Sequence, residues 1–360
     1  MDKRLLLILL GAALLSSCTE NLPAAQKWHT GNEGLVMRFV SGSPPKYVFP
    51  DEEFSVLVEV SNEGAFSVAR TVGAKEDIDW LSFFKGGGVK AEIGILAKSY
   101  NAFYLRDITD LYMPPDMVGP SLEDLFPNHK YAVSDLALVE LAGSSEYLPQ
   151  GDTNVYEYVF RANPLQGQIE SPVTQLFFTL CYPYRTYWSQ AVCIDKDIHD
   201  LDKRAKVCTV KDISLSQGQG APVAITRIEP RTLSAGGDIK VNFNIYFENK
   251  AGGMVLRKDP AKFSDSQAAC LGSVAGDDGT IPVRANLLNQ ELDCSPIRFK
   301  DNKARSTCRS QSLDTNAYGT DGVISGEARN FLSHLYVEVD YMYQSQMVAD
   351  VEVVREDVPR

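Results

Sequence analysis

Two stretches in which apolar and polar residues alternate constrain the fold of this chain more than any other feature. In residues 54–61, FSVLVEVS, every second side chain is Phe or Val, and Leu57 is the only apolar residue between them. Residues 239–248, IKVNFNIYFE, place Ile, Val or Phe at every second position. A period of two is typical of a strand that buries one face. Both stretches are therefore predicted to be β-strands with one face in a core.

The two predicted strands belong to a plan that occurs twice. Each follows a shorter apolar strand, at residues 35–40 and 223–228, and a turn that contains Pro or Gly. Each also ends at an Asn that precedes a Gly, and these residues, Asn62 and Asn249, are 187 positions apart. The alternative is that any two sandwich domains begin with a strand, a turn and an alternating strand. We interpret the spacing as two copies of one supersecondary plan.

The sequence after residue 18 predicts an all-β protein with antiparallel pairing, because none of its stretches keeps a helical period of apolar residues. A length of 360 residues suggests about two domains. We expect two Ig-like antiparallel β-sandwich domains in tandem, at residues 33–213 and 221–360, joined by the linker SLSQGQG at 214–220. The first domain exceeds the ~100 residues that a sandwich needs, so an irregular insertion is predicted near residues 75–130.

Two hairpins are predicted near the ends of these domains. One joins residues 174–184 to 187–195, and the other joins residues 335–343 to 347–353 through a Gln-Ser-Gln turn. Tyr, Trp and Arg anchor many protein interfaces, and the tip of the first hairpin concentrates them. The alternative is that half of them face the core as strand residues. The candidate binding residues are Tyr184, Arg185, Tyr187 and Trp188.

Two motifs resemble known surface proteins. The strand, turn, alternating strand and Asn-Gly ending, carried by residues 54–64 and 239–252, resemble the Ig-like CARDB type of adhesion domain. The sequence CYPYRT at residues 181–186 is similar to a hairpin of uncharacterised prokaryotic, especially archaeal, surface lipoproteins. The resemblance implies a β-sandwich fold and display on a cell surface, and it implies no activity.

The first 18 residues have the layout of an export signal: two basic residues, an apolar run at 5–15, and small residues before Cys18. The apolar run is shorter than the roughly 20 residues that span a bilayer. Because Leu-Ser-Ser-Cys resembles a lipobox, we predict a signal peptide at residues 1–17, diacylation of Cys18 and a tether at residues 18–32. The alternatives are a conventional cleavage site near Cys18 and an uncleaved anchor.

Six cysteines remain once Cys18 is assigned to lipid, and an even number in an exported chain indicates disulfides. The candidates are Cys181, Cys193, Cys208, Cys270, Cys294 and Cys308. Six cysteines allow 15 pairings, and the sequence does not choose among them. One set joins Cys193 to Cys208 and Cys294 to Cys308, which leaves Cys181 and Cys270 for a bond between the domains. In the alternative, each domain keeps a free thiol.

One acidic cluster is a candidate calcium site, because carboxylate oxygens suit this cation. Its spacing is not that of an EF-hand, since Lys206 stands where the final Glu is required. The alternative is a solvated loop whose charge is offset by neighbouring Lys and Arg residues. No cofactor other than calcium is expected. The candidate ligands are Asp195, Asp197, Asp200 and Asp202.

Charge and motifs narrow the class of function. The net charge of −12 argues against nucleic-acid binding, which depends on neutralising phosphates. The common serine-hydrolase, zinc-protease and P-loop motifs are missing, so no enzymatic activity is predicted. We expect an exported, membrane-anchored binding or structural protein of the cell surface, with a lipid anchor and a surface protein or glycan as partner. The alternative is an exported enzyme or solute-binding component that uses residues 108–130.

Overall fold

The computed structural model describes residues 29–69, 89–90, 94–99, 103–110, 141–162, 173–195, 206–235, 238–257, 279–311 and 330–355. All regular secondary structure in these ranges is β-strand, and the sheets are mainly antiparallel, which confirms the predicted all-β fold. No helix in these ranges has the length and hydrophobicity needed to cross a membrane. The predicted signal peptide, Cys18 and most of the predicted insertion lie outside the described residues.

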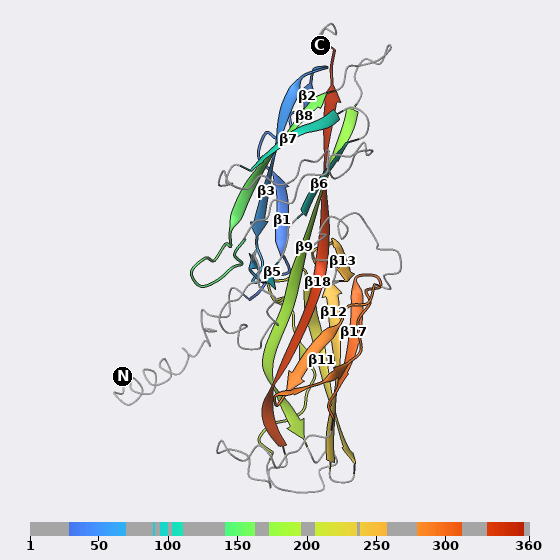
Figure 1. Cartoon of the computed structure of the whole chain (residues 1–360). Coiled ribbons are helices and arrows are strands. Elements are labelled where there is room, and N and C mark those ends of the chain that lie inside the picture. The colour runs from blue at the N-terminus through green and yellow to red at the C-terminus, as the bar shows by residue number, and fades with distance from the viewer. Residues whose placement is uncertain are drawn as a thin grey trace, which may run out of the picture.

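Two smaller sheets occupy opposite ends of an elongated molecule (Figure 1). The sheet of the N-terminal half runs in the order β1 (Leu35–Phe39), β3 (Glu53–Asn62), β8 (Thr153–Ala162) and β7 (Phe103–Asp110). The sheet of the C-terminal half runs in the order β10 (Ile213–Ser214), β11 (Val223–Ala235), β12 (Asp238–Asn249), β17 (Lys303–Arg309) and β16 (Asp293–Cys294).

A third, seven-stranded sheet extends through both halves (Figure 1). Its main path is β15 (Gln290–Glu291), β14 (Val283–Leu287), β18 (Asn330–Val353), β9 (Val173–Asp195) and β6 (Gly94–Ser99). Two short strands, β13 (Met254–Arg257) and β2 (Tyr47–Val48), also pair with β18. The small pair β4 (Val68–Ala69) and β5 (Val89–Lys90) completes the strands of the described residues.

Strands β9 and β18 connect the two halves of the molecule. They have 23 and 24 residues and pair antiparallel without interruption, from Val173 opposite Glu352 to Asp195 opposite Asn330. At about 3.3 Å per residue, the ribbon is about 75 Å long. The two halves share one sheet, and each long strand contributes to both, so the structure does not confirm the two-domain tandem arrangement predicted from the sequence.

Both hairpins predicted from the sequence are wrong. Arg185, at the predicted tip of the first, lies in the middle of β9 and is paired with Asp340. Ser345, at the centre of the predicted second turn, continues β18 and is paired with Leu180. Neither tip contains a Gly, Pro or Asn that would favour a tight turn. The long-range pairing between β9 and β18 therefore determines the structure here, although the polar residues at both predicted tips suggest turns.

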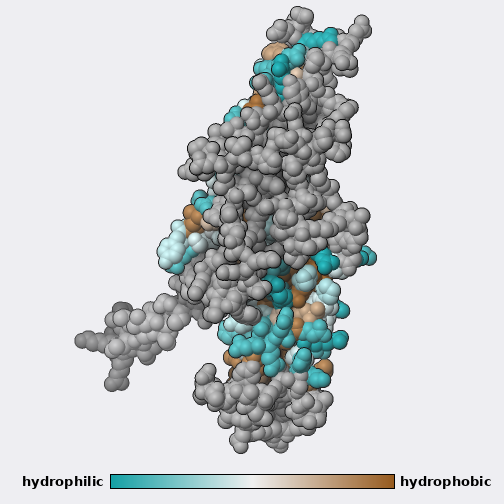
Figure 2. All heavy atoms as spheres, viewed as in Figure 1, coloured by the Kyte–Doolittle hydropathy of each residue, from teal (hydrophilic) through white to brown (hydrophobic). Residues whose placement is uncertain are grey.

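The alternating strands bury their apolar faces as predicted. Phe54, Val56, Val58 and Val60 of β3 are at most 7% exposed. The corresponding apolar residues of β12 are at most 1% exposed; they are Val241, Phe243, Ile245 and Phe247. Ring contacts such as Tyr158–Phe178, with centroids 5.2 Å apart, pack β8 against β9. In the view of Figure 2, the described surface of the C-terminal half is mainly hydrophilic, which is consistent with this inward burial.

The repeat predicted from the sequence extends to matching hydrogen bonds. The Asn62 Nδ2 donates to the carbonyl of Phe66 at 2.8 Å, and the Asn249 Nδ2 donates to the carbonyl of Gly253 at 2.6 Å. The Tyr184 hydroxyl of β9 donates to the Asn62 Oδ1 at 3.3 Å, and the Tyr343 hydroxyl of β18 donates to the Asn249 Oδ1 at 2.9 Å. Strands β9 and β18 therefore occupy equivalent places in two copies of one plan, and each extends into the other copy.

The C-terminal end of the predicted linker, residues 219–220, is packed into the folded body. The Gln219 side chain is 7% exposed, and it accepts from the Ile225 amide at 2.7 Å and donates to the Ile225 carbonyl at 3.1 Å. Gly31 donates to the Gln217 carbonyl at 2.7 Å and accepts from the Gly220 amide at 2.9 Å. The last residues of the predicted tether therefore belong to the folded body, while residues 18–28 lie outside the described part.

Two disulfides support the C-terminal half. Cys193 of β9 is bonded to Cys208, and Cys294 of β16 is bonded to Cys308 of β17. They close loops of 15 and 14 residues, for which a chain-entropy model gives about 3 kcal/mol each. Both bonds belong to one of the pairings considered from the sequence. Cys270 and the side chain of Cys181 lie outside the described part.

Candidate binding site

The four binding residues predicted from the sequence do not form an exposed tip. Tyr184, Arg185 and Trp188 are 1%, 5% and 8% exposed, and Tyr187 is half-buried. Because β9 is continuous, Tyr184 and Trp188 point to the core side of the sheet and Arg185 points to the opposite side. The premise of an accessible aromatic cluster at a hairpin tip is therefore wrong.

Arg185 is instead part of a charge network on the outer side of the long ribbon. Its guanidinium contacts both carboxylate oxygens of Asp340, at 2.6 and 3.0 Å, and Glu338 at 3.3 Å. Arg284 of β14 pairs with the same two carboxylates. The Arg185 guanidinium also lies 5.5 Å from the ring centre of Phe66. Two cations and two anions balance one another, which is typical of a structural network.

The tyrosines at the centre of the ribbon are structural as well. The Tyr184 hydroxyl accepts from the Phe66 amide at 3.2 Å, and the Tyr341 hydroxyl accepts from the Val223 amide at 3.2 Å. Burial raises the pKa of Tyr184 and of Tyr341 far above the ordinary value for tyrosine, and burial likewise raises the pKa of Tyr343 to about 12. These phenols are neutral hydrogen-bonding groups at ordinary pH.

The predicted calcium site is described only at Asp195. This residue ends β9, is 6% exposed, and its Oδ2 lies 2.8 Å from the Nζ of Lys206. Asp197, Asp200 and Asp202 lie outside the described residues, so the calcium site stays a prediction. In the ranges that the structure describes, no group of three or more His, Cys, Asp or Glu side chains is placed to hold a metal ion.

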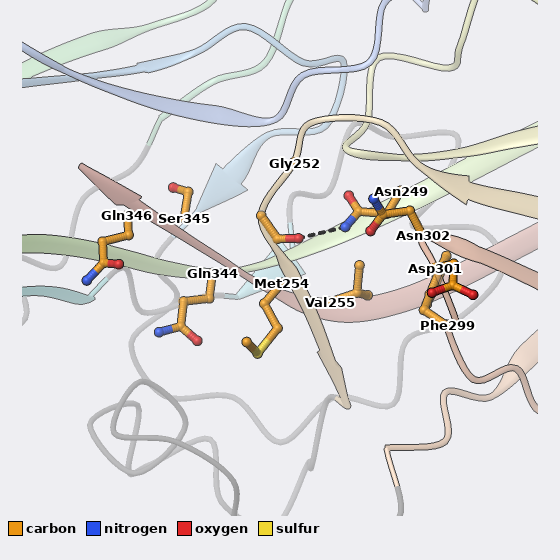
Figure 3. Close-up of a pocket in the computed structure, with 11 residues that line it drawn as sticks. Asn249, Gly252, Met254, Val255, Phe299, Asp301, Asn302, Gln344, Ser345 and Gln346 are labelled. Carbon is orange, nitrogen blue, oxygen red and sulfur yellow. Dashed lines mark hydrogen bonds between the residues drawn. The ribbon is translucent and has the colours of Figure 1, made fainter. Parts of the chain in front are cut away.

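A polar hollow of about 580 Å³ lies where three segments meet: the loop from β12 to β13, the hairpin before β17, and the middle of β18 (Figure 3). Binding cavities for small ligands usually have a volume of about 300–1,000 Å³. We call this feature the β18 hollow. It is lined by Asn249, Gly252, Gly253, Met254, Val255, Phe299, Asp301, Asn302, Gln344, Ser345 and Gln346.

Backbone conformation explains why these segments approach so closely. A Cβ atom on Gly253 would lie 2.4 Å from the carbonyl oxygen of Gln344, so only glycine lets this loop contact β18. Asp301 and Asn302 have φ angles of 51° and 61°, and they form the two-residue turn between Lys300 and Lys303. Such angles are favoured by Asn, Asp and Gly in tight hairpins.

Hydrogen bonds fix one wall of the hollow. Asn249 connects the loop to β18. Its Nδ2 donates to the Gly253 carbonyl (Figure 3), and its Oδ1 accepts from the Tyr343 hydroxyl of β18. The Gly253 amide donates to the Tyr343 hydroxyl at 2.6 Å. The backbone amide of Asn249 donates to the backbone carbonyl of Asn302 at 2.8 Å, and this bond holds the hairpin before β17 in place. The wall is thus held by hydrogen bonds within the chain.

The lining favours neutral polar or cationic groups. It offers side-chain amides, one hydroxyl and a single carboxylate, that of Asp301, and its members include no Lys, Arg or His. An anionic ligand would find no charge partner among them. Met254, which is 57% exposed, and Phe299 add apolar surface. Gln344 and Gln346 project to one side of β18, and Ser345 projects to the other (Figure 3).

Sequence reasoning missed this site because its parts are far apart in the chain. The Asn-Gly signal at residues 249–252 correctly predicts a turn, but it does not show which segments the turn contacts. Residues 344–346 were predicted to be a turn of their own. Only the pairing of β13 with β18 brings them together.

A comparison of the chain with protein-family models and with curated proteins gives no match. The class of protein therefore rests on the fold and the site. The fold defines an all-β, disulfide-bonded protein whose two halves share one long sheet. Its candidate site is the preformed β18 hollow next to the middle of that sheet.

Proposed function

We propose that this chain is a lipid-anchored, extracytoplasmic binding protein of the cell surface that recognises a surface protein or glycan. The export-signal layout and the lipobox-like Cys18 support export and anchoring. The two disulfides support an oxidising compartment, where such bonds form and persist. Two acyl chains on Cys18 provide stable membrane attachment, whereas a single chain gives only marginal binding.

The observation that carries the proposal is the β18 hollow on a stiff scaffold. The ladder between β9 and β18 continues through both halves, so bending between the halves would break cross-strand hydrogen bonds. The loop from β12 to β13 is held against β18 by hydrogen bonds among Asn249, Gly253 and Tyr343. A rigid site loses little conformational entropy on binding, which favours affinity. Its donors and acceptors suit recognition of a polar group.

Mass spectrometry of the mature protein tests the anchoring. We expect the mature chain to begin at Cys18 and to carry two acyl chains on that residue. The Cys18→Ala variant should leave the membrane fraction, and Ser17→Ala, which keeps a small residue before the cysteine, should remain in it. A mature chain that begins elsewhere and carries no lipid would contradict the anchoring part of the proposal.

Binding assays test the recognition part. The full mature protein would be applied to a glycan array and to an array of random heptapeptides. We expect at least one class of probe to bind, and the double variant Gln344→Ala/Gln346→Ala to weaken that binding by about tenfold or more, which corresponds to about 1.4 kcal/mol. The matched control is Gln190→Ala, an exposed glutamine of β9 that is outside the hollow. Equal effects of the two changes would contradict a role for the β18 hollow.

A further inference from the structure

Between two short strands, one edge of β18 has no pairing strand among the residues that the structure describes. Strand β13 pairs with β18 from Tyr341 to Gln344, and β2 pairs with it at Glu352 and Val353. Residues 345–351 of β18 lie between them and pair with β9 on the opposite edge. Within the described ranges, no strand pairs with this stretch on the edge that β13 and β2 share. We call residues 345–351 the open edge.

A hydrogen bond to the chain just before β2 shows to which edge the amide and carbonyl groups of the open edge point. The Glu352 amide donates to the Lys46 carbonyl at 3.0 Å, so it points toward the edge that holds β2. Successive residues of a strand direct their amide and carbonyl groups to opposite edges. Gln346, Val348 and Asp350 therefore direct both groups toward the open edge. All three are exposed, and Val348 is 44% exposed.

The flanking strands limit what this edge accepts. The seven residues of the open edge span about 23 Å at 3.3 Å per residue. A pairing segment must leave the sheet at both ends, because β13 and β2 occupy the same lateral position. The β18 strand of a second copy is 24 residues long, so it would collide with both flanking strands. The geometry therefore selects a short extended segment over a long strand.

The charges near the edge indicate the composition of that segment. The β18 hollow adjoins the open edge at Gln344 and Gln346, and its single charged side chain is Asp301. Asp350 places a second carboxylate at the far end of the open edge. The whole chain carries a net charge of −12. A segment with Lys or Arg is complementary to this surface, whereas an acidic segment is repelled.

We infer that the open edge docks a short, extended, basic peptide segment of a partner protein, which adds a strand to β18 and places a Lys or Arg side chain in the β18 hollow. Main-chain hydrogen bonds to Gln346, Val348 and Asp350 supply the affinity, and the hollow supplies the specificity, as in other cases of strand addition. This inference rests on the proposed function and specifies the partner as a protein.

The test uses the heptapeptide array with the full, disulfide-bonded protein. We expect the array to yield binders enriched in Lys or Arg among β-branched residues. Val348→Pro removes the outward amide without removing a bond to β9, and proline is tolerated at a strand edge. The substitution should weaken binding of the selected peptides by about tenfold or more, because it removes one hydrogen bond and blocks close approach of the peptide backbone. Val348→Thr, which keeps the amide, should bind as the wild type does.

Amide exchange measured by NMR separates docking from misfolding. In Val348→Pro, slow exchange at Met347 and Ala349, whose amides point toward β9, would show that the ladder is intact. In the wild type, the selected peptide should slow exchange at Gln346, Val348 and Asp350. The Asp301→Asn substitution should weaken binding of peptides that carry Lys or Arg.

The outcomes distinguish this inference from the proposed function. Peptide binding that is insensitive to Val348→Pro would overturn the inference and leave a binding role for the hollow. Binding to glycans alone would overturn it in the same way. Failure of both arrays would contradict the recognition part of the proposed function as well.

Discussion

Replacing Asn62 with alanine should lower the free energy of unfolding by about 2–6 kcal/mol, because two backbone groups are left without a partner. The Asn62 side chain is completely buried. Its Nδ2 donates to the carbonyls of Phe66 and Leu141 at 2.8 and 2.9 Å, and its Oδ1 accepts from Gly64 at 3.2 Å. The Leu141 carbonyl keeps the Val68 amide as a donor at 3.0 Å, so the Phe66 carbonyl and the Gly64 amide are the groups left without a partner. Each such group costs about 1–3 kcal/mol. Tyr184, the fourth partner, keeps the Gly220 carbonyl as an alternative acceptor.

The Asn62→Asp variant adds a pH dependence with a defined sign. The introduced carboxylate would face the carbonyl oxygens of Phe66 and Leu141, so burial and repulsion would raise its pKa in the folded protein. A pKa that is higher in the folded than in the unfolded state gives the greatest stability below the unfolded value, about 4 for Asp. Above that pH, stability should fall by up to about 1.4 kcal/mol per pH unit, until the folded pKa is passed.

Urea unfolding with the disulfides intact measures both effects. The matched control is Asn154→Ala on β8, a half-buried asparagine whose side chain accepts from Val155 and makes a long contact with Tyr156. We expect the control to cost about 1 kcal/mol or less. If Asn62→Ala and Asn154→Ala destabilise the protein equally, the reasoning about Asn62 is refuted. An Asn62→Asp variant whose stability does not change between pH 4 and 7 would refute the electrostatic part.

Three further predictions concern the junction, the tyrosines and the disulfides. Gly64→Ala should destabilise by about 3 kcal/mol or more in urea unfolding, because its Cβ would lie 2.5 and 2.6 Å from the backbone oxygens of Glu33 and Gly220. Stability should be retained below about pH 10 and should decline above it, because burial raises the folded pKa of Tyr182 and Tyr341; phenolate absorbance should rise together with unfolding. Cys193→Ser/Cys208→Ser should lower the urea unfolding free energy by about 3 kcal/mol, with an unchanged far-ultraviolet spectrum.

The parts of the fold that the sequence predicts are those encoded locally. The alternation at residues 54–61 and 239–248 predicts both strands and their buried faces, because a period of two directly reports one-sided burial. The spacing between Asn62 and Asn249 predicts the repeat, because both residues close the same turn. These signals need no knowledge of the remainder of the chain.

The errors concern contacts that connect distant residues. Polar residues at the centre of β9 and β18 resemble turns in the sequence, yet Arg185 is compensated by Asp340, which lies 155 positions away. Of the binding residues predicted at that tip, Tyr184, Arg185 and Trp188 are buried because they lie within the continuous strand β9. The β18 hollow was missed because Asn249, Asn302 and Gln344 come together only through sheet pairing. No local pattern contains that information.

The pairing of β9 with β18 also determines when the protein can fold. Asp195 meets Asn330 across 135 positions of sequence, and Val173 meets Glu352 across 179. Such a high contact order makes folding slow, since distant segments must first find each other. The shared sheet cannot close until the last strand of the chain is present. Until β18 is available, β9 has no partner along the edge that β18 occupies, so the two halves stay unconnected by their shared sheet.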